Sequence, residues 1–237
     1  MNSHTDERVL VIPAMYAIDV CKGFSSDTTS QKLAAELINS DQLRFMPRSQ
    51  VEDDPEFLQL IPYVILYYYN PKPVVGNAFR VFTYCRGRAG GEARLTDKRS
   101  LGVGGHINDS DAILPRDAFK VGVGREIEEE VACSFCRVGN LHGTIYDDTD
   151  AVGQVHLGIV ISFRLLDSPI ITRDKSIVDP MLCSIDSLIA GAESFENWSR
   201  LIIDGLLSDP VNSPNEMNTN SPFILGTKHG PRSMTTN

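Results

Sequence analysis

The chain has little of what marks a secreted or membrane-bound protein. Its five cysteines are an odd number with irregular spacing, which argues against a disulfide framework. Cys133 and Cys136 form one CxxC pair, but the sequence has no second pair and no HxxxH partner for a zinc site. The longest apolar run, 61–69, is too short to span a bilayer, and the N-terminus lacks the basic and apolar segments of a signal peptide. We therefore expect a cytoplasmic protein with no membrane partner.

Positive charge is also scarce. The 22 Lys and Arg residues against 31 Asp and Glu residues give 22 − 31 = −9, so a basic footprint for a nucleic-acid polymer is absent. The acidic surplus suits a protein that collects divalent cations. With 42% hydrophobic and 22% charged residues over 237 positions, the composition is that of a soluble globular protein with a real core.

Apolar patterns predict an irregular mixture of strands and helices. We expect strands at 9–12, 61–69, 79–85, 141–146 and 155–166, and helices at 30–38, from 54 onward, 115–131, 184–189 and 195–207. The mixture lacks regular βαβ alternation, which favours an α+β domain over a doubly wound parallel sheet. Because Pro, Asn, Ser and Thr dominate at the end, we expect a single domain with an N-terminal extension over 1–207 and a mobile polar tail over 208–237.

The most informative segment is REIEEEV, which begins at Arg125. Each helical residue turns by about 100°, so Glu126, Glu129 and Glu130 share one face and Glu128 points away. Such like charges repel by roughly 0.2–0.5 kcal/mol per pair, and the helix dipole disfavours anions at this end. Arg125 can reach Glu129, but it cannot neutralise three carboxylates. Clustered carboxylate oxygens suit Mg²⁺ or Mn²⁺, which favours a metal site over a solvated charged face.

This segment resembles the core of the Nudix box, R-E-U-x-E-E-x-G-U, in which U is apolar. Residues 125–133 fit, except that Ala132 stands where the family has glycine. The stretches that resemble the branch described as predicted MutT-family phosphoesterases are 61–63, 100–107, 152–158 and 196–199. The family pattern G-x5-E-x7-R-E is shorter than the 125 − 105 = 20 positions from Gly105 to Arg125. We expect the extra residues in the loop 108–114 and Asp117 in place of the upstream glutamate.

The resemblance implies a Nudix-type α/β/α sandwich with a mixed central sheet. It implies a metal-dependent hydrolase that cleaves a phosphoanhydride bond in a nucleoside diphosphate-linked small molecule, by attack of water on phosphorus. The implied cofactor is Mg²⁺ (or Mn²⁺), and the implied partners are a diphosphate-containing substrate and a second copy in a homodimer. The sequence leaves the particular substrate open.

The resemblance also assigns roles to residues of the box. Glu126 and Glu130 would be the principal metal ligands, Glu129 would assist or bind a second ion, and the backbone carbonyl of Gly104 would complete the coordination. Glycine is suitable there because it lets the backbone approach a ligand closely. Arg125 would belong to the catalytic set with Glu126 and Glu129. The general base stays open between these two glutamates and three acidic residues outside the box, Asp147, Asp148 and Glu193.

Other residues are weaker candidates. Arg86, Arg88 and Arg94 lie on a glycine-rich loop and could bind phosphate through their guanidinium groups, although ordinary surface arginines fit equally well. His106 and His156 have apolar, strand-like surroundings that favour a structural role.

Two other functions compete with the hydrolase. One is a Nudix domain that binds a nucleotide or sugar diphosphate without cutting it, but such domains usually lack a glutamate of the box helix. The other is an enzyme like isopentenyl-diphosphate isomerase, which needs a catalytic cysteine. Cys85 could take that place, but no supporting motif surrounds it.

Overall fold

The computed structural model describes residues 7–17, 19–20, 22–70, 72, 79–87, 95–167, 170–207 and 221–227. The strands are β1 (Arg8–Pro13), β2 (Gly23–Ser25), β3 (Arg44–Pro47), β4 (Phe57–Tyr69), β5 (Phe79–Arg86), β6 (Arg99–Ser100), β7 (Gly102–Val103), β8 (Val131–Ala132), β9 (Val138–Tyr146), β10 (His156–Arg164), β11 (Ile171–Thr172), β12 (Ile177–Cys183) and β13 (Pro222–Ile224). The α-helices are α1 (Thr28–Ile38), α2 (Arg48–Val51), α3 (Pro115–Glu130), α4 (Ala151–Gln154), α5 (Ile185–Ala190) and α6 (Asn197–Ile202). Short 3-10 turns are η1 (Ala14–Tyr16) and η3 (Ala192–Ser194), and a π-helical turn, η4 (Ile203–Leu207), follows α6.

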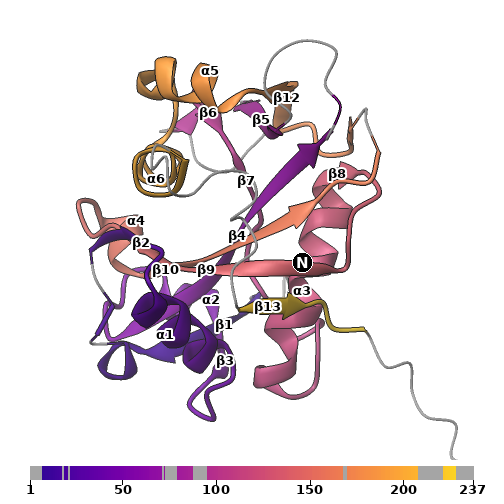
Figure 1. Ribbon diagram of the computed structural model, residues 1–237. Coiled ribbons are helices and arrows are strands. Elements are labelled where there is room, and N and C mark those ends of the chain that lie inside the picture. The colour runs from indigo at the N-terminus through magenta and orange to yellow at the C-terminus, as the bar shows by residue number, and fades with distance from the viewer. Residues whose placement is uncertain are drawn as a thin grey trace, which may run out of the picture.

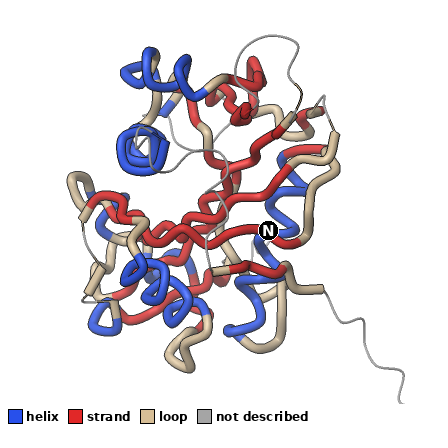
Figure 2. Tube along the Cα trace, in the orientation of Figure 1, coloured by secondary structure: helices blue, strands red, loops and turns tan. Residues whose placement is uncertain are grey.

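Most strands join one mixed sheet, whose main path runs β12-β5-β4-β10-β9-β13 (Figure 1). The two central strands, β4 and β10, are parallel, whereas β9 and β5 are antiparallel to their neighbours. Figure 2 shows the strands running through the middle with helices on both sides. The expected α+β class with a mixed central sheet is therefore confirmed.

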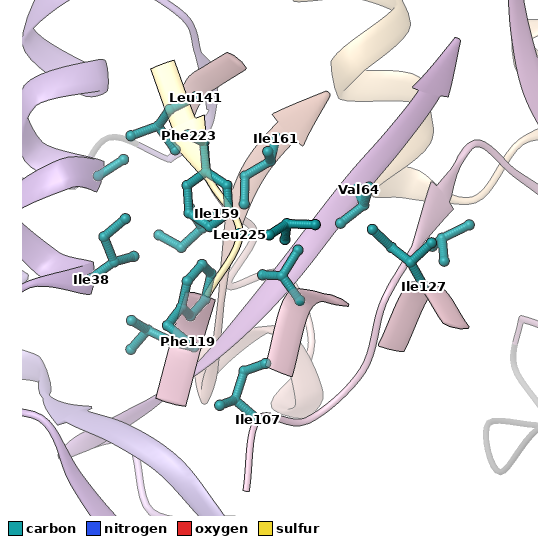
Figure 3. Close-up of a cluster of buried hydrophobic side chains, with 14 of the residues drawn as sticks. Ile38, Val64, Ile107, Phe119, Ile127, Leu141, Ile159, Ile161, Phe223 and Leu225 are labelled. Atoms are coloured by element: carbon teal, nitrogen blue, oxygen red, sulfur yellow. The ribbon is translucent and has the colours of Figure 1, made fainter. Parts of the chain in front are cut away.

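The two faces of the sheet bury different helices, because successive side chains of a strand point to opposite faces. Val64 and Leu66 of β4 belong to a core that includes residues of α1 and α3, part of which Figure 3 shows. Tyr63 and Ile65 belong to a second core with residues of α5, α6 and η4. Helices thus cover both faces, which makes the α/β/α sandwich that the sequence predicted.

Three local predictions needed correction. The first helix begins at Thr28 and is capped by Asp27, whose side chain accepts a hydrogen bond from the backbone N–H of Ser30, the residue expected as the cap. The second short helix, α2, lies before Asp54 and not after it. Strand β4 begins earlier than expected because its first residues pair with β1.

Strand β13 lies within the region that the sequence predicted as a polar tail, 208–237. It pairs with β9, and the side chains of Phe223 and Leu225 are buried in the same core as Phe119 of α3 (Figure 3). The prediction of a tail was therefore wrong for residues 221–227. The sequence pattern that would predict this strand is weak, because the strand is short and lies between polar stretches. Only its alternate side chains face the core.

The two glycines inside α3 lead to opposite expectations. A Cβ at Gly122 would lie 2.5 Å from Ile107 Cδ1 and 2.7 Å from Asp111 Oδ2, whereas a Cβ at Gly124 would lie 4.0 Å from its nearest neighbour, Leu225. We expect Gly124→Ala to raise the free energy of unfolding by up to about 1 kcal/mol, the difference in helix propensity, and Gly122→Ala to lower it. Urea denaturation of both variants tests this. A similar effect of the two substitutions would mean that α3 does not pack as closely as described.

Candidate active site

The predicted carboxylates lie at the C-terminal end of α3, facing the loop that follows β7. Glu126 is buried, with 8% of its surface exposed, whereas the side chain of Glu129 is 59% exposed. Glu128 is exposed and Glu130 is half-buried. Glu126 and Glu130 therefore point into the protein, while Glu129 lies at the rim.

Glu130 has a hydrogen-bonding capacity that the described residues do not use. Its Oε1 accepts a hydrogen bond from the backbone N–H of Gly104 at 3.3 Å, whereas Oε2 is buried without a partner. Burial, followed by the nearby charge of Glu126, raises the pKa of Glu130 to about 8. A carboxylate in this position would be stabilised by a cation.

Glu126 is in a similar environment one helical turn earlier. Burial raises its pKa to about 7, and the positive charge of Arg125 acts in the opposite direction. Its Oε1 accepts a hydrogen bond from Arg125 Nη1 at 2.8 Å. A Cβ at Gly105 would lie 2.7 Å from Oε2 of Glu126, so a larger residue there would displace the carboxylate of Glu126.

Glycines also bring the backbone of the loop close to its neighbours. Gly104 has φ +150°, and a Cβ there would lie 2.0 Å from the carbonyl oxygen of Pro62. A Cβ at Gly102 would lie 2.3 Å from the ring of Tyr63. The glycine pattern of 102–105 therefore follows from close packing between β4, the loop and α3.

Arg125 connects the loop that follows β7 to the carboxylates of α3. Its Nε and Nη2 donate to the two carboxylate oxygens of Asp111 at 2.7 and 2.8 Å, and Nη2 also donates to the backbone oxygen of His106 at 3.0 Å. Nη1 donates to Glu126 and, at 2.9 Å, to Oε2 of Glu129. One guanidinium thus fixes the loop and orients two of the three candidate carboxylates.

Asp111 corrects the alignment with the family pattern. The expectation placed the upstream acid at Asp117, but that residue is exposed in the first turn of α3. Asp111 lies 111 − 105 = 6 positions after Gly105, which is the G-x5-E spacing, and it pairs with Arg125. The additional residues therefore lie between Asp111 and Arg125 and not throughout the loop 108–114. The G-x5 spacing is the sequence signal that would have identified Asp111.

A second residue without a role in the sequence analysis, Glu196, anchors the strand that leads to Gly104. Oε1 of Glu196 accepts hydrogen bonds from the hydroxyl of Tyr63 at 2.8 Å and from the backbone N–H of Ser199 at 2.9 Å. The hydroxyl oxygen of Ser199 accepts from the backbone N–H of Leu101 at 3.0 Å. The start of α6 is thereby tied to both β4 and the box loop.

The other predicted site residues lie in different places. Arg86, at the end of β5, is close enough for its charge to oppose the raised pKa of Glu130, whereas Arg88 and Arg94 lie outside the described residues. Asp148 forms an ion pair with Lys22 at 2.5 Å, and Asp147 accepts a hydrogen bond from Asn197.

Glu193 lies in η3, on the side of the sheet that α5 and α6 cover. Cys85, considered for an isomerase, accepts a hydrogen bond from Arg99 Nη1 at 3.2 Å.

The donor set fits a divalent cation. Among the described residues, no three His, Cys, Asp or Glu side chains already converge on one point, and Arg125 binds oxygens of Glu126 and Glu129. However, the unpartnered Oε2 of Glu130, the second buried carboxylate at Glu126 and the close backbone at Gly104 together offer hard oxygen ligands. In the described part of the chain, no helix combines the length and apolarity needed to cross a membrane.

Comparison with known proteins agrees with this geometry. No family model matches the chain. Over 214 residues it is 30% identical to the protein YmaB of Bacillus subtilis (strain 168), a match that covers 84% of this chain and 97% of YmaB. The crystal structure of Tm1382, a proposed Nudix hydrolase, superposes with a TM-score of 0.69 at 26% identity and covers 85% of this chain and 98% of Tm1382.

The fold, the box helix and these relatives define the class: the chain belongs to the Nudix hydrolases. It is accordingly an enzyme of the class that acts on pyrophosphate bonds. Members of this class generally use divalent metals.

Proposed function

We propose that the protein uses Mg²⁺ or Mn²⁺ to hydrolyse a phosphoanhydride bond in a nucleoside diphosphate-linked small molecule. The observation that carries the proposal is the buried, unpartnered Oε2 of Glu130, beside a second buried carboxylate and opposite the glycine loop. Leaving a buried acceptor unpaired costs about 1–3 kcal/mol. A bound cation would recover this free energy. The box glutamates and the family membership favour a hydrolase over a domain that only binds its ligand.

The proposed division of roles follows from burial and contacts. Glu126 and Glu130 would hold the ion, assisted by the carbonyl of Gly104, and the chemistry supplied there would be a lower pKa of bound water and compensation of charge on the phosphate oxygens. Arg125 keeps Glu126 and Glu129 in place. Because Glu129 is the most exposed of the three, it accepts the proton of the attacking water. Arg86, close to Glu130, binds a phosphate oxygen of the substrate.

The test compares wild type, Glu130→Gln and Glu128→Gln on a panel of diphosphate substrates, with Mg²⁺, Mn²⁺ or EDTA. Glu128 is the matched control because it is exposed on the same helix and its side chain points away from the loop. We expect metal-dependent turnover in wild type and Glu128→Gln. We expect a loss of more than about 100-fold in Glu130→Gln, because even an outer-shell partner of a metal ligand contributes 10–100-fold.

Two outcomes would contradict the proposal. Turnover that persists in EDTA and in Glu130→Gln would exclude the metal-centred mechanism. A ligand that raises the melting temperature of both proteins equally, with no turnover of any substrate, would favour a binding module. The panel includes ADP-ribose, nucleoside triphosphates, dinucleoside polyphosphates and sugar nucleotides, so the best substrate identifies the substrate class.

The remaining sequence-based expectations stay predictions. They are a single domain over 1–207, a homodimer and a cytoplasmic location.

A further inference from the structure

Two histidines outside the carboxylate cluster face each other beside the box loop. Nε2 of His106 lies 3.3 Å from Nε2 of His156, the first residue of β10. The ring planes are inclined by 61°, so the nitrogen edges meet and the ring faces do not stack. His156 is buried, with 8% of its surface exposed, and His106 is half-buried. The proposed reaction uses neither side chain.

The protonation of His156 follows from its second contact. Its Nδ1 lies 2.6 Å from the backbone oxygen of Val152 in α4. A carbonyl oxygen can only accept, so Nδ1 carries the hydrogen and Nε2 of the neutral ring presents a lone pair to His106. Metal-binding histidines almost always donate their other N–H in this way, which fixes the orientation of the ring.

The separation of the two nitrogens also suits a shared metal ion. Zinc binds imidazole nitrogen at 2.0–2.1 Å, and at a tetrahedral angle two such ligands are about 3.3–3.4 Å apart. In the metal-free pair, the hydrogen between the rings belongs to Nε2 of His106. When a cation takes its place, this hydrogen moves to Nδ1 of His106, so the ring stays neutral and needs no external proton acceptor.

Gln59 offers a third donor on the same face of the sheet. Gln59 and His156 are direct partners in the parallel register of β4 and β10, so their side chains leave the sheet on one side. Gln59 is fully buried, and its Nε2 lies 3.4 Å from the backbone oxygen of Val51. That contact fixes the orientation of the amide group. The other amide atom, Oε1, is buried and has no hydrogen-bond partner. An unpaired buried amide oxygen on the strand position next to His156 leaves a donor available to a ligand.

Charged groups near the pair act in both directions. The charge of Arg48 acts on His106 and opposes a bound cation, but Glu52 acts on the same ring in the opposite direction. Arg48 donates two hydrogen bonds to the carboxylate of Glu52, at 2.7 and 3.2 Å. The donors are therefore two imidazole nitrogens and one amide oxygen, with charged groups of both signs nearby.

We propose that His106, His156 and Gln59 bind one transition-metal ion of the zinc class, with water as the remaining ligand, at a site separate from the carboxylates. Imidazole nitrogen suits Zn²⁺, Cu²⁺ and Ni²⁺, whereas carboxylate oxygen suits Mg²⁺ and Mn²⁺, so the two sites select different ions. The ion tethers α4 and the start of β10 to the loop that contains Gly104. It is a structural tether and takes no part in hydrolysis.

Titration with Co²⁺, followed by visible absorption, tests the proposal without measuring activity. Four-coordinate Co²⁺ absorbs far more strongly than six-coordinate Co²⁺, so a nitrogen-containing tetrahedral site is distinguished from an octahedral oxygen site. We expect one equivalent of strongly absorbing Co²⁺ in wild type and in Glu130→Gln, and none in His156→Gln. Absence of the strong band in wild type, or its persistence in His156→Gln, would overturn the proposal.

A second measurement does not depend on the folding of a variant. In wild-type protein, addition of Zn²⁺ should shift the ¹⁵N resonances of the ring nitrogens of His106 and His156 at one equivalent, while those of His142 stay unchanged. His142 is the matched control because it is buried and bonded to Ser162 through Nε2. If Zn²⁺ leaves both rings of the pair unaffected, the contact is only a hydrogen bond and the site does not exist. The proposed hydrolase activity is tested separately, by the turnover of Glu130→Gln. If zinc does not bind to the histidine pair, that proposal is not affected.

Discussion

Replacing Arg125 by methionine is expected to lower the free energy of unfolding by about 3–5 kcal/mol, because it leaves a buried charge without its partner. The side chain of Asp111 has no exposed surface and accepts two hydrogen bonds from the guanidinium of Arg125. Methionine retains much of the volume, so the loss reports charge pairing more than packing. Urea denaturation measures the change, and metal-dependent turnover should fall with it because Glu126 and Glu129 lose their common donor.

Arg116→Met is the matched control on the same helix. Arg116 forms an ion pair with Asp41 at 3.6 Å, and both side chains are largely exposed, so we expect a change of about 0–1 kcal/mol. Adding Asp111→Asn to Arg125→Met should recover part of the stability, since it removes the unpaired charge. If Arg125→Met were as stable as Arg116→Met, the pairing with Asp111 would not support the fold.

Replacing Phe223 by alanine is expected to cost about 3–5 kcal/mol of unfolding free energy, although the residue lies in a region whose sequence predicted a tail. Its ring meets those of Phe119 and Phe163 edge to face, with centroids 6.2 and 6.1 Å apart. Figure 3 shows Phe223 and Leu225 among the side chains of α3 and the central sheet. Denaturant titration should show a lower midpoint with an unchanged slope.

The adjacent residue provides the control. Ile224 is 61% exposed and belongs to the same strand, so Ile224→Ala should change stability by no more than about 0.5 kcal/mol. Equal effects of the two substitutions would mean that residues 221–227 contribute only through their backbone pairing with β9. A small effect of both would restore the tail that the sequence predicted.

The sequence predicted the parts of the fold that depend on local pattern. The helix of residues 115–131 was expected almost within its observed bounds, because Pro115 begins it and its apolar residues face the core. The clustering of Glu126 and Glu130 followed from helical periodicity alone. The enzyme class was predicted from the box motif, and the α/β/α sandwich was predicted from the resemblance to the family.

What the sequence did not predict depends on contacts between distant residues. Asp117 keeps the E-x7-R spacing before Arg125 and Asp111 keeps the G-x5-E spacing after Gly105, so only the pairing with Arg125 shows which acid occupies the position. The start of α1 is a local exception, because the nearby polar residues Asp27 and Ser30 can both cap a helix and Asp27 does so. The pairing of His106 with His156 joins a loop to a strand 50 residues away, which no periodicity records.

The strand at Pro222–Ile224 also orders events during synthesis. Phe119 and Phe223 are in contact, yet they are separated by 223 − 119 = 104 positions. The helix with the carboxylates is therefore translated long before strand β13, which packs against it. At about 5–20 residues per second, the interval is roughly 5–20 s. From the translation of Asn140 until that of Pro222, 222 − 140 = 82 positions later, the edge of β9 that pairs with β13 has its backbone groups unpaired, and such edges favour association with other chains. Chaperone demand for this protein should therefore be greatest while its last hundred residues are being made.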